Sequence, residues 1–279
     1  MNLAFAFAGR ARGRFLSLGL AGLMLAALSA CASVPPASDP VAVKEYEARN
    51  DPLEPMNRYF FEVNKGLDML LIHPFSEFYR VGVPDPIQDR IHYFLQNLTS
   101  PVTFANDLFQ GNGTIAGHTL TRFLINSTLG VGGLFDVATD WGFPYHSEDF
   151  GQTLAVHGVG AGPYLMVPLI GPSNPRDLVG RVVDSFLDPL TYVTGGIGNP
   201  NHLQLIRYAA TVIDFRTRNR QAIDDLYKNS LDPYAALRDI YRQHRAQEIR
   251  NTEQGIEGGT GGKPAAPAPA GGITLDQPN

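Results

Sequence analysis

The sequence predicts a mainly α-helical fold, and three observations support this. After Asp51, apolar residues recur three or four positions apart, as they do along one face of a helix: Leu53, Met56, Phe60, Val63, Leu67 and Leu70. Two Asp-Pro pairs, at 51–52 and 232–233, combine a capping side chain with a proline suited to a first helical turn. Few segments alternate with the period of two that half-buried strands show.

Residues 1–30 resemble a bacterial lipoprotein signal peptide. Three arginines (Arg10, Arg12, Arg14) precede an apolar run over 15–30, which ends in Leu-Ser-Ala directly before Cys31. Cleavage before Cys31 would leave this cysteine, the only one in the chain, to carry the lipid. The alternative is a plain secretory signal followed by an incidental cysteine. Two or more acyl chains hold a protein stably, since each buried methylene contributes roughly 0.8 kcal/mol. Ala32 at the next position favours the outer membrane as destination.

Residues 31–48 are expected to form a tether, and residues 49–250 a single helical domain. The first helix is predicted over 53–71, with Asp51 and Glu54 completing a capping box. Further helices are predicted from apolar spacing and Ser-Pro, Asp-Pro or glycine boundaries: 87–98, 100–109, 115–129, 203–228 and one starting at Asp232. No stretch reaches the roughly 20 apolar residues of a transmembrane span.

Residues 148–175 interrupt the helical pattern. Glycines and prolines alternate there with apolar residues, and Gly158, Gly160 and Gly162 directly precede Pro163. Inside a helix a glycine costs about 1 kcal/mol and a proline about 3 kcal/mol, which excludes a helix interior. The segment is predicted to be an apolar, hairpin-like loop. It is either a buried connection or a moving gate.

The C-terminal residues 251–279 are predicted to be a disordered tail rich in glycine, proline and alanine. The glycines before Lys263 do not form a phosphate loop. Glu257 stands where the first glycine is needed, and Pro264 replaces the Ser or Thr that would bind magnesium.

The charge of the mature chain argues against nucleic acid as a partner. Removing residues 1–30 takes away three arginines and no acid, so the 22 basic residues fall to 19 against 27 acids, a formal charge of −8. Such a chain also lacks a polybasic patch for anionic lipid. With a single cysteine there is no intramolecular disulfide.

The motifs of an enzyme are absent or incomplete. The nearest approach to a Gly-x-Ser-x-Gly elbow surrounds Ser173, which has prolines at both flanks and lacks the second glycine. No two histidines stand three to five positions apart, as a helix-borne zinc site requires. A glycine motif at 111–116 follows a predicted helix, so the strand context of a dinucleotide site fails. His146, Glu148 and Asp149 lack a nucleophile beside them. We expect no catalysis and no cofactor.

Several blocks of sequence together resemble the MlaA/VacJ family of outer-membrane lipoproteins. Residues 50–58 (Asn-Asp-Pro-Leu-Glu-Pro-Met-Asn-Arg) are similar to its N-terminal signature, and residues 121–130 (Thr-Arg-Phe-Leu-Ile-Asn-Ser-Thr-Leu-Gly) to its central one. Further similar blocks follow in order at 133–136, 148–154, 158–164, 188–190 and 231–234. The resemblance covers roughly residues 50–245, and the C-terminal tail lies outside it.

The resemblance implies a ring of amphipathic helices in the outer membrane around an amphipathic channel, with the glycine-rich hairpin-like loop beside it. It implies removal of mislocalised phospholipid from the outer leaflet and delivery to a soluble periplasmic carrier. It also implies a porin trimer as neighbour and attachment on the periplasmic side. Two other classes stay open: a porin-associated structural lipoprotein without transport, and a lipid-acting hydrolase.

Three groups of candidate residues follow from this comparison and from the residue types. The gate loop comprises Gly151, Gly158, Gly160, Gly162 and Pro163. Charged side chains that could line a head-group path are Arg122, Arg176, Arg181 and Asp184, whose alternative is a solvated helix face. The N-terminal helix, a second regulatory candidate, contributes Asp51, Asn57, Arg58, Phe60 and Asn64.

Overall fold

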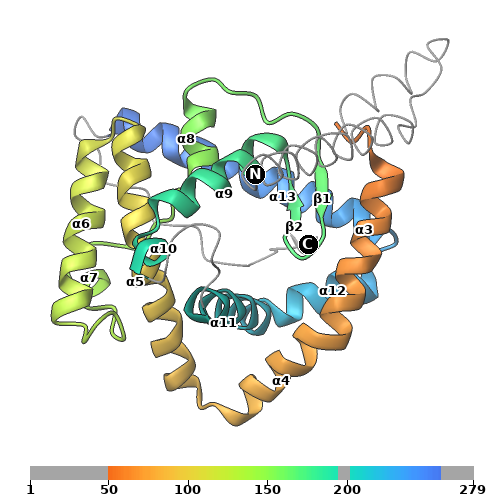
Figure 1. Ribbon diagram of the computed structural model, residues 1–279, viewed down its shortest axis with the longest axis horizontal. Coiled ribbons are helices and arrows are strands. Elements are labelled where there is room, and N and C mark those ends of the chain that lie inside the picture. Colours follow the sequence, from red (N-terminus) through yellow and green to blue (C-terminus); the bar gives the residue numbers. More distant parts are fainter. Residues whose placement is uncertain (1–49, 194–201, 259–279) are drawn as a thin grey trace, which may run out of the picture.

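The computed structural model describes residues 50–193 and 202–258 (Figure 1). The signal peptide, the tether and Cys31 lie outside these residues, as does the tail beyond residue 258. The described part is mainly helical, as predicted. Its first half contains α3 (Glu54–Leu67), the π-helix η1 (Asp68–Ile72), α4 (His73–Gly82), α5 (Asp85–Phe109), α6 (Gly113–Thr128), α7 (Val137–Asp140) and α8 (Phe150–Val156). Its second half contains β1 (Leu165–Val167), β2 (Gly171–Ser173), α9 (Pro175–Leu187), α10 (Pro189–Val193), α11 (His202–Arg218), α12 (Arg220–Asn229) and α13 (Pro233–Gly258).

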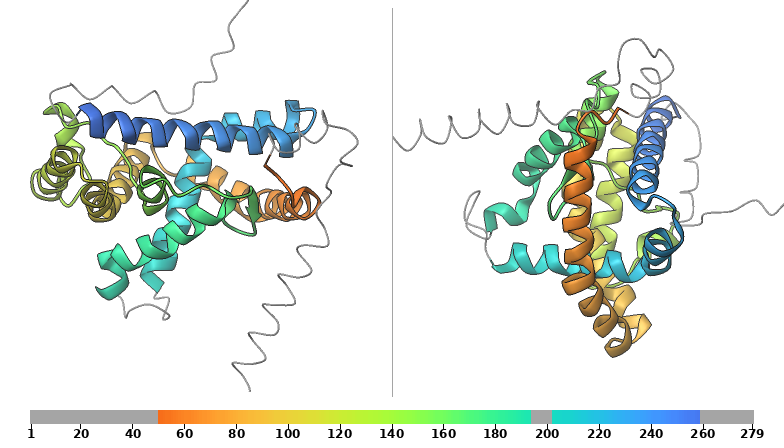
Figure 2. Two further views of the ribbon diagram at one scale, coloured as in Figure 1. Left: turned by 90° about the horizontal axis from the view of Figure 1, so that it is seen from above. Right: turned by 90° about the vertical axis from the view of Figure 1, so that its right-hand side faces the viewer.

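The helices follow one another around a ring (Figure 1). α5 packs along α6, α8 on α9, and α11 against α4. The two strands form one antiparallel hairpin in which Met166 pairs with Pro172, and β1 lies against α3. Figure 2 shows α13 running across one face of the ring, while α9 and α11 extend from the opposite face.

The usual distribution of side chains is reversed, because most buried side chains are polar and many large hydrophobic ones are exposed. Among the described residues, 27 polar or charged side chains are buried, against seven hydrophobic ones. Over the same residues, 32 large hydrophobic side chains are exposed, including Leu70 (77%), Phe78 (80%) and Val81 (75%). The main apolar cluster is small and joins α3, the hairpin and α13 through Phe61, Tyr164, Met166 and Tyr234. So many exposed large hydrophobic side chains are typical of a surface that a partner or a lipid covers.

The start of α3 differs from the prediction. Asp51 makes no cap; its carboxylate is buried and accepts hydrogen bonds from Asn57, Tyr234 and Arg238. Glu54 pairs instead with Arg58, one turn along the helix. The prediction of a capping box was wrong, because the Asp51 carboxylate bonds instead to Tyr234 and Arg238, which lie nearly two hundred positions away in the chain.

Three predicted boundaries were also wrong. One helix, α5, runs unbroken through 85–109 with Pro101 inside it, because buried residues on both sides of the proline pack against neighbouring helices. The expected helix 203–228 is divided at Asn219 into α11 and α12. α13 continues to Gly258, so residues 251–258 are helical rather than part of a disordered tail. Its start at Asp232 is confirmed, since that carboxylate accepts from the backbone N–H of Ala235 at 3.1 Å.

Candidate functional site

The glycine-rich segment divides into a helix, a loop and a hairpin. Gly151 lies inside α8, is buried, and packs against Gly180 of α9, so its assignment to a gate loop was wrong. Gly158 and Gly162 lie in the connecting loop with φ of +83° and +75°, a backbone region that favours glycine. Gly160 does not have a positive φ, and it is not closely packed, since no other atom lies within 4 Å of where its Cβ would be.

Two asparagines on one face of α3 hold the hairpin by its backbone. Asn57 donates to the carbonyl of Tyr164 at 3.0 Å and accepts from the N–H of Met166 at 2.9 Å. Asn64, seven positions and two turns further, donates to Val167 at 2.9 Å and accepts from Leu169 at 2.8 Å. Each amide therefore replaces the hydrogen bonds that a third strand would make along β1.

The base of the hairpin is fixed more firmly than its tip. At the base, Asn57 is fully buried and also donates to Asp51 at 2.8 Å. At the tip, Leu169 has a φ of +67°, is 72% exposed, and its carbonyl accepts from the hydroxyl of Tyr208 on α11 at 3.1 Å. A non-glycine residue in the left-handed region marks local strain. We call the buried contacts of Asn57 at the base the hinge, and the exposed contacts of Asn64 and Tyr208 at the tip the latch.

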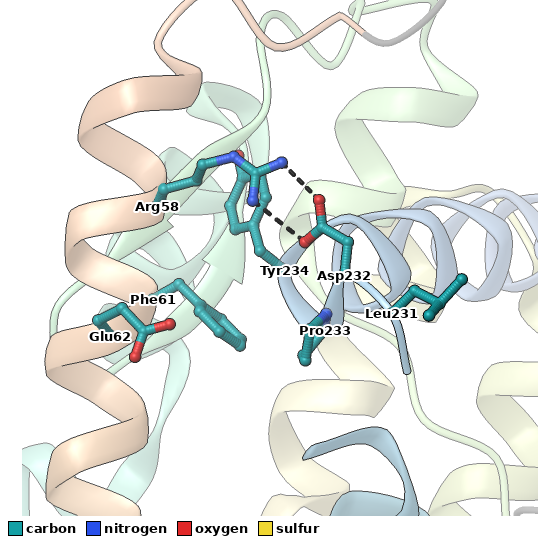
Figure 3. Close-up of a pocket in the computed structure, with 7 residues that line it drawn as sticks. All are labelled: Arg58, Phe61, Glu62, Leu231, Asp232, Pro233 and Tyr234. Atoms are coloured by element: carbon teal, nitrogen blue, oxygen red, sulfur yellow. Dashed lines mark hydrogen bonds and ion pairs between the residues drawn. The ribbon is translucent and has the colours of Figure 1, made fainter. Parts of the chain in front are cut away.

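A cavity of about 410 Å³ lies beside this hinge, between α3 and the start of α13 (Figure 3). Phe61 and Tyr234 line it, and Arg58 forms its charged edge. Arg58 bonds both carboxylate oxygens of Asp232, at 2.6 and 3.1 Å, and its guanidinium stacks 4.5 Å from the ring centre of Tyr234. Phe60, on the same helix, packs against the apolar cluster.

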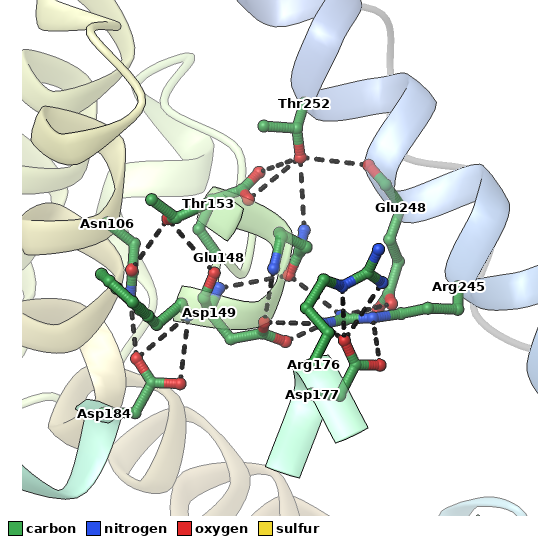
Figure 4. Close-up of polar contacts among 12 residues, drawn as sticks. Asn106, Glu148, Asp149, Thr153, Arg176, Asp177, Asp184, Arg245, Glu248 and Thr252 are labelled. Carbon is green, nitrogen blue, oxygen red and sulfur yellow. Dashed lines mark hydrogen bonds and ion pairs between the residues drawn. The ribbon is translucent and has the colours of Figure 1, made fainter. Parts of the chain in front are cut away.

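A buried ionic network connects α13 to α8 and α9 (Figure 4). Arg245 bonds Asp149 at 2.6 Å, Asp177 at 2.9 Å and Glu248 at 3.0 Å. Arg176 shares Asp177 at 3.1 Å. Attraction to Arg245 and Arg176, with hydrogen bonds from Arg245 and Tyr241, holds the pKa of the Asp177 carboxyl below its ordinary value although burial opposes this.

Of the four charges expected along a head-group path, three are engaged inside the protein. Arg122 is buried and bonds Asp136 at 2.6 Å, while Arg176 belongs to the network above. Asp184 accepts from Asn106 at 2.9 Å and from the backbone of Phe150 at 3.1 Å, and burial raises its pKa. Arg181 alone is exposed. The four side chains therefore do not form one cluster.

Glu148 is a buried carboxyl that accepts a hydrogen bond from Thr252 of α13. Burial raises its pKa to about 7, although Gln110 and Thr252 donate to its carboxylate at 3.0 Å. The folded protein therefore binds this proton more tightly than the unfolded chain, and stability should fall as pH rises from about 4.5 to 7.

The variant Glu148→Gln should lack this dependence. We expect its unfolding free energy in detergent solution to exceed that of the unaltered protein at pH 8 by roughly 1–3 kcal/mol, and the difference to shrink towards pH 5. Denaturant titrations at several pH values measure this. Glu253→Gln, at an exposed position of α13, should give a difference that does not change with pH. A constant difference for Glu148→Gln would contradict the expectation.

The fold and these contacts define a class: a helical ring with an apolar exterior, an ionic interior and one hairpin latched by side chains. In residues 50–193 and 202–258, no helix has both the length and the apolar character that crossing a membrane demands. The family model for the MlaA lipoprotein matches residues 49–248. The chain belongs to the MlaA lipoprotein family.

Curated relatives and a solved structure agree with this membership. The intermembrane phospholipid transport system lipoprotein MlaA of Escherichia coli (strain K12) is 32% identical over 205 residues, which cover 71% of this chain and 78% of that protein. An uncharacterized protein of Rickettsia felis is 39% identical over 199 residues, 71% of this chain and 76% of the relative. A solved structure reported as "Structural basis for maintenance of bacterial outer membrane lipid asymmetry" has a TM-score of 0.64 at 32% identity, covering 71% of this chain and 98% of that one.

Sequence reasoning missed the contacts that organise the site. The seven-residue spacing of Asn57 and Asn64 places them on one face of a helix and is a usable signal. No comparable signal pairs Asp51 with Tyr234, or Asp149 with Arg245, because these partners lie 183 and 96 positions apart.

Proposed function

We propose that this chain is an outer-membrane lipoprotein of an intermembrane phospholipid transport system. It would remove phospholipid mislocalised to the outer leaflet and pass it to a soluble periplasmic carrier, and so maintain lipid asymmetry. The observation that carries this proposal is the reversed distribution of polarity, with 32 large exposed hydrophobic side chains around an interior of buried charges. Membership of the MlaA lipoprotein family supports it.

The physical logic follows from the substrate. A phospholipid has a charged head group and two apolar tails, so its path needs polar groups beside apolar ones. In this proposal a channel within the helical ring provides the path, and Arg181 is the best candidate of the four charges to meet head groups. Arg122, Arg176 and Asp184 would shape the path indirectly, because their charges are satisfied inside the protein.

The hairpin and its preceding loop are proposed as the gate, and α3 as its regulator. The exposed latch at Asn64 and Tyr208 supports this, because such contacts open at lower cost than the buried ones at Asn57. Transport through such a gate involves no covalent chemistry, so we propose a non-enzymatic role. A porin trimer is proposed as the neighbour of the apolar exterior, with Cys31 holding the protein on the periplasmic side of the outer membrane.

Surface-exposed phospholipid in a deletion strain tests the function. We expect it to rise on deletion, to return to normal with the unaltered gene, and to respond less to a Cys31→Ser gene. Normal asymmetry after deletion would leave the structural-lipoprotein alternative. Release of lysophospholipid or fatty acid by the purified protein would instead favour the hydrolase.

The gate is tested by Gly160→Val. The space around Gly160 is open and its φ is ordinary, so we expect the fold to tolerate valine, while the β-branched side chain stiffens the loop. Outer-leaflet phospholipid should then rise towards the level of the deletion strain, with an unchanged melting temperature. Gly82→Val, in equally open space at the end of α4, is the matched control. Normal asymmetry in the Gly160→Val strain would refute a bending loop.

A further inference from the structure

The turn between α6 and α7, residues 129–135, is apolar and carries no charged residue. We call it the α6–α7 turn. Its large side chains are exposed: Leu129 58%, Val131 62%, Leu134 37% and Phe135 44%. On the preceding helix α6, Leu120 and Leu124 are exposed as well, at 42% and 52%. A loop tip in water is ordinarily polar, so this composition calls for an explanation.

Val131 is the least expected residue of this turn. Its φ is +54°, in the left-handed region where a β-branched residue is a genuine outlier. Its side chain is largely exposed and so gains little packing within the protein. In water this position would therefore combine backbone strain with apolar exposure. A contact outside the chain would cover the exposed side chain.

Six of the seven backbone N–H groups of the turn donate to carbonyl oxygens of the chain itself. The N–H groups of residues 129 to 133 and of Phe135 all bond to carbonyl oxygens within residues 125–130, at N···O distances from 2.7 to 3.4 Å. Lipid cannot accept hydrogen bonds from a backbone, so an irregular segment must satisfy its own donors before it can be covered by lipid. A surface made for an aqueous partner has no such requirement.

The turn is also held rigidly. A Cβ on Gly130 would overlap the carbonyl oxygens of Asn126 and Phe135, which fixes the close approach of the chain there. Beneath it, Asn126 donates to Asp136 at 3.0 Å, and Asp136 bonds Arg122 at 2.6 Å. The left-handed conformation of Val131 is thus imposed by its surroundings before any partner arrives.

We propose that the α6–α7 turn inserts into the phospholipid bilayer at the boundary between head groups and acyl chains, with Val131 leading. The acyl chains cover the apolar side chains, and the carbonyl groups of the turn remain near interfacial water. The proposal rests on the proposed function only in placing this body in a phospholipid membrane, and it requires no transport.

A fluorescent label at position 131 tests it. Acylated Cys31 has no free thiol, so Val131→Cys in the mature, lipid-modified protein supplies a single site for an environment-sensitive nitrobenzoxadiazole dye. Gln243→Cys, at an exposed position of α13, is the matched control. In vesicles of phosphatidylethanolamine and phosphatidylglycerol, acyl chains brominated near the glycerol should quench the dye at 131 roughly fivefold more than at 243, and iodide in the buffer should do the reverse.

Equal quenching by iodide at both positions would overturn the proposal. So would shielding from iodide at 131 without quenching by bromine, which would indicate a protein contact instead. Val131→Asp should lower vesicle binding of the Cys31→Ser protein roughly tenfold, while Val131→Gly, which relieves the strain, should raise the melting temperature and weaken binding less. Lost transport with intact bromine quenching would count against the proposed function alone.

Discussion

Replacing Arg245 by methionine should unfold this protein more readily than any other single substitution in the ionic network. Methionine keeps an unbranched apolar stem but leaves Asp149, Asp177 and Glu248 without their shared cation. Removing one partner of a buried ion pair typically costs about 3–5 kcal/mol. We expect a loss at the lower end of this range, because Arg176 still pairs with Asp177 and the carboxylates of Asp149 and Glu248 are partly exposed. Denaturant titration of the purified protein in detergent measures this loss.

The matched control is Arg250→Met, on the same helix at an exposed position. Its effect should lie within about 0.5 kcal/mol of zero. Adding Asp149→Asn to Arg245→Met should recover part of the loss, because one uncompensated charge disappears. Equal stability of Arg245→Met and Arg250→Met would show that the network does not hold α13 on α8 and α9.

Alanine at Gly180 should force α8 and α9 apart. A Cβ there would overlap the backbone nitrogen of Gly151 and lie 2.8 Å from its Cα, so a backbone rather than a flexible side chain must give way. Overpacking of this kind costs about 1–3 kcal/mol. The melting temperature should fall, and limited proteolysis should cut first near the α8–α9 contact.

Gly117→Ala provides the contrast. Gly117 lies within α6, and no atom outside its own helix stands within 4 Å of the added methyl group. Alanine there should stabilise the protein by about 0.5–1 kcal/mol, because it restricts the unfolded chain and favours the helix. A loss of stability at Gly117 as large as at Gly180 would mean that close helix approach is not the cause.

The sequence was informative where structure is local. The spacing of Leu53, Met56 and Phe60 predicts α3, and the Asp232 cap predicts the start of α13. The sequence was misleading where a residue bonds to a partner far away in the chain. Asp51, for example, accepts a hydrogen bond from Tyr234 and does not cap its own helix. Pro101 was taken for a boundary because propensity is a local quantity, whereas packing on both sides of the proline keeps α5 continuous.

The candidate site shows the same division. The glycine pattern predicts the loop before the hairpin, where the backbone of Gly158 and Gly162 is left-handed and therefore favours glycine. The pattern could not separate them from Gly151, a glycine that serves close packing instead. The burial of charged residues was even harder to predict from the sequence. Nothing local distinguishes Arg176, which is buried against Asp177, from Arg181, which faces outward five positions later.

The polar interior of the ring also has a thermal consequence. The heat capacity of unfolding rises with apolar surface exposed to water and falls with polar surface exposed. Here the buried side chains are mostly polar, with 27 against seven hydrophobic ones in the described residues. Unfolding should therefore change the heat capacity little for a chain of this length. The stability curve would then be unusually flat, so the free energy of unfolding would change little between a cold and a warm envelope.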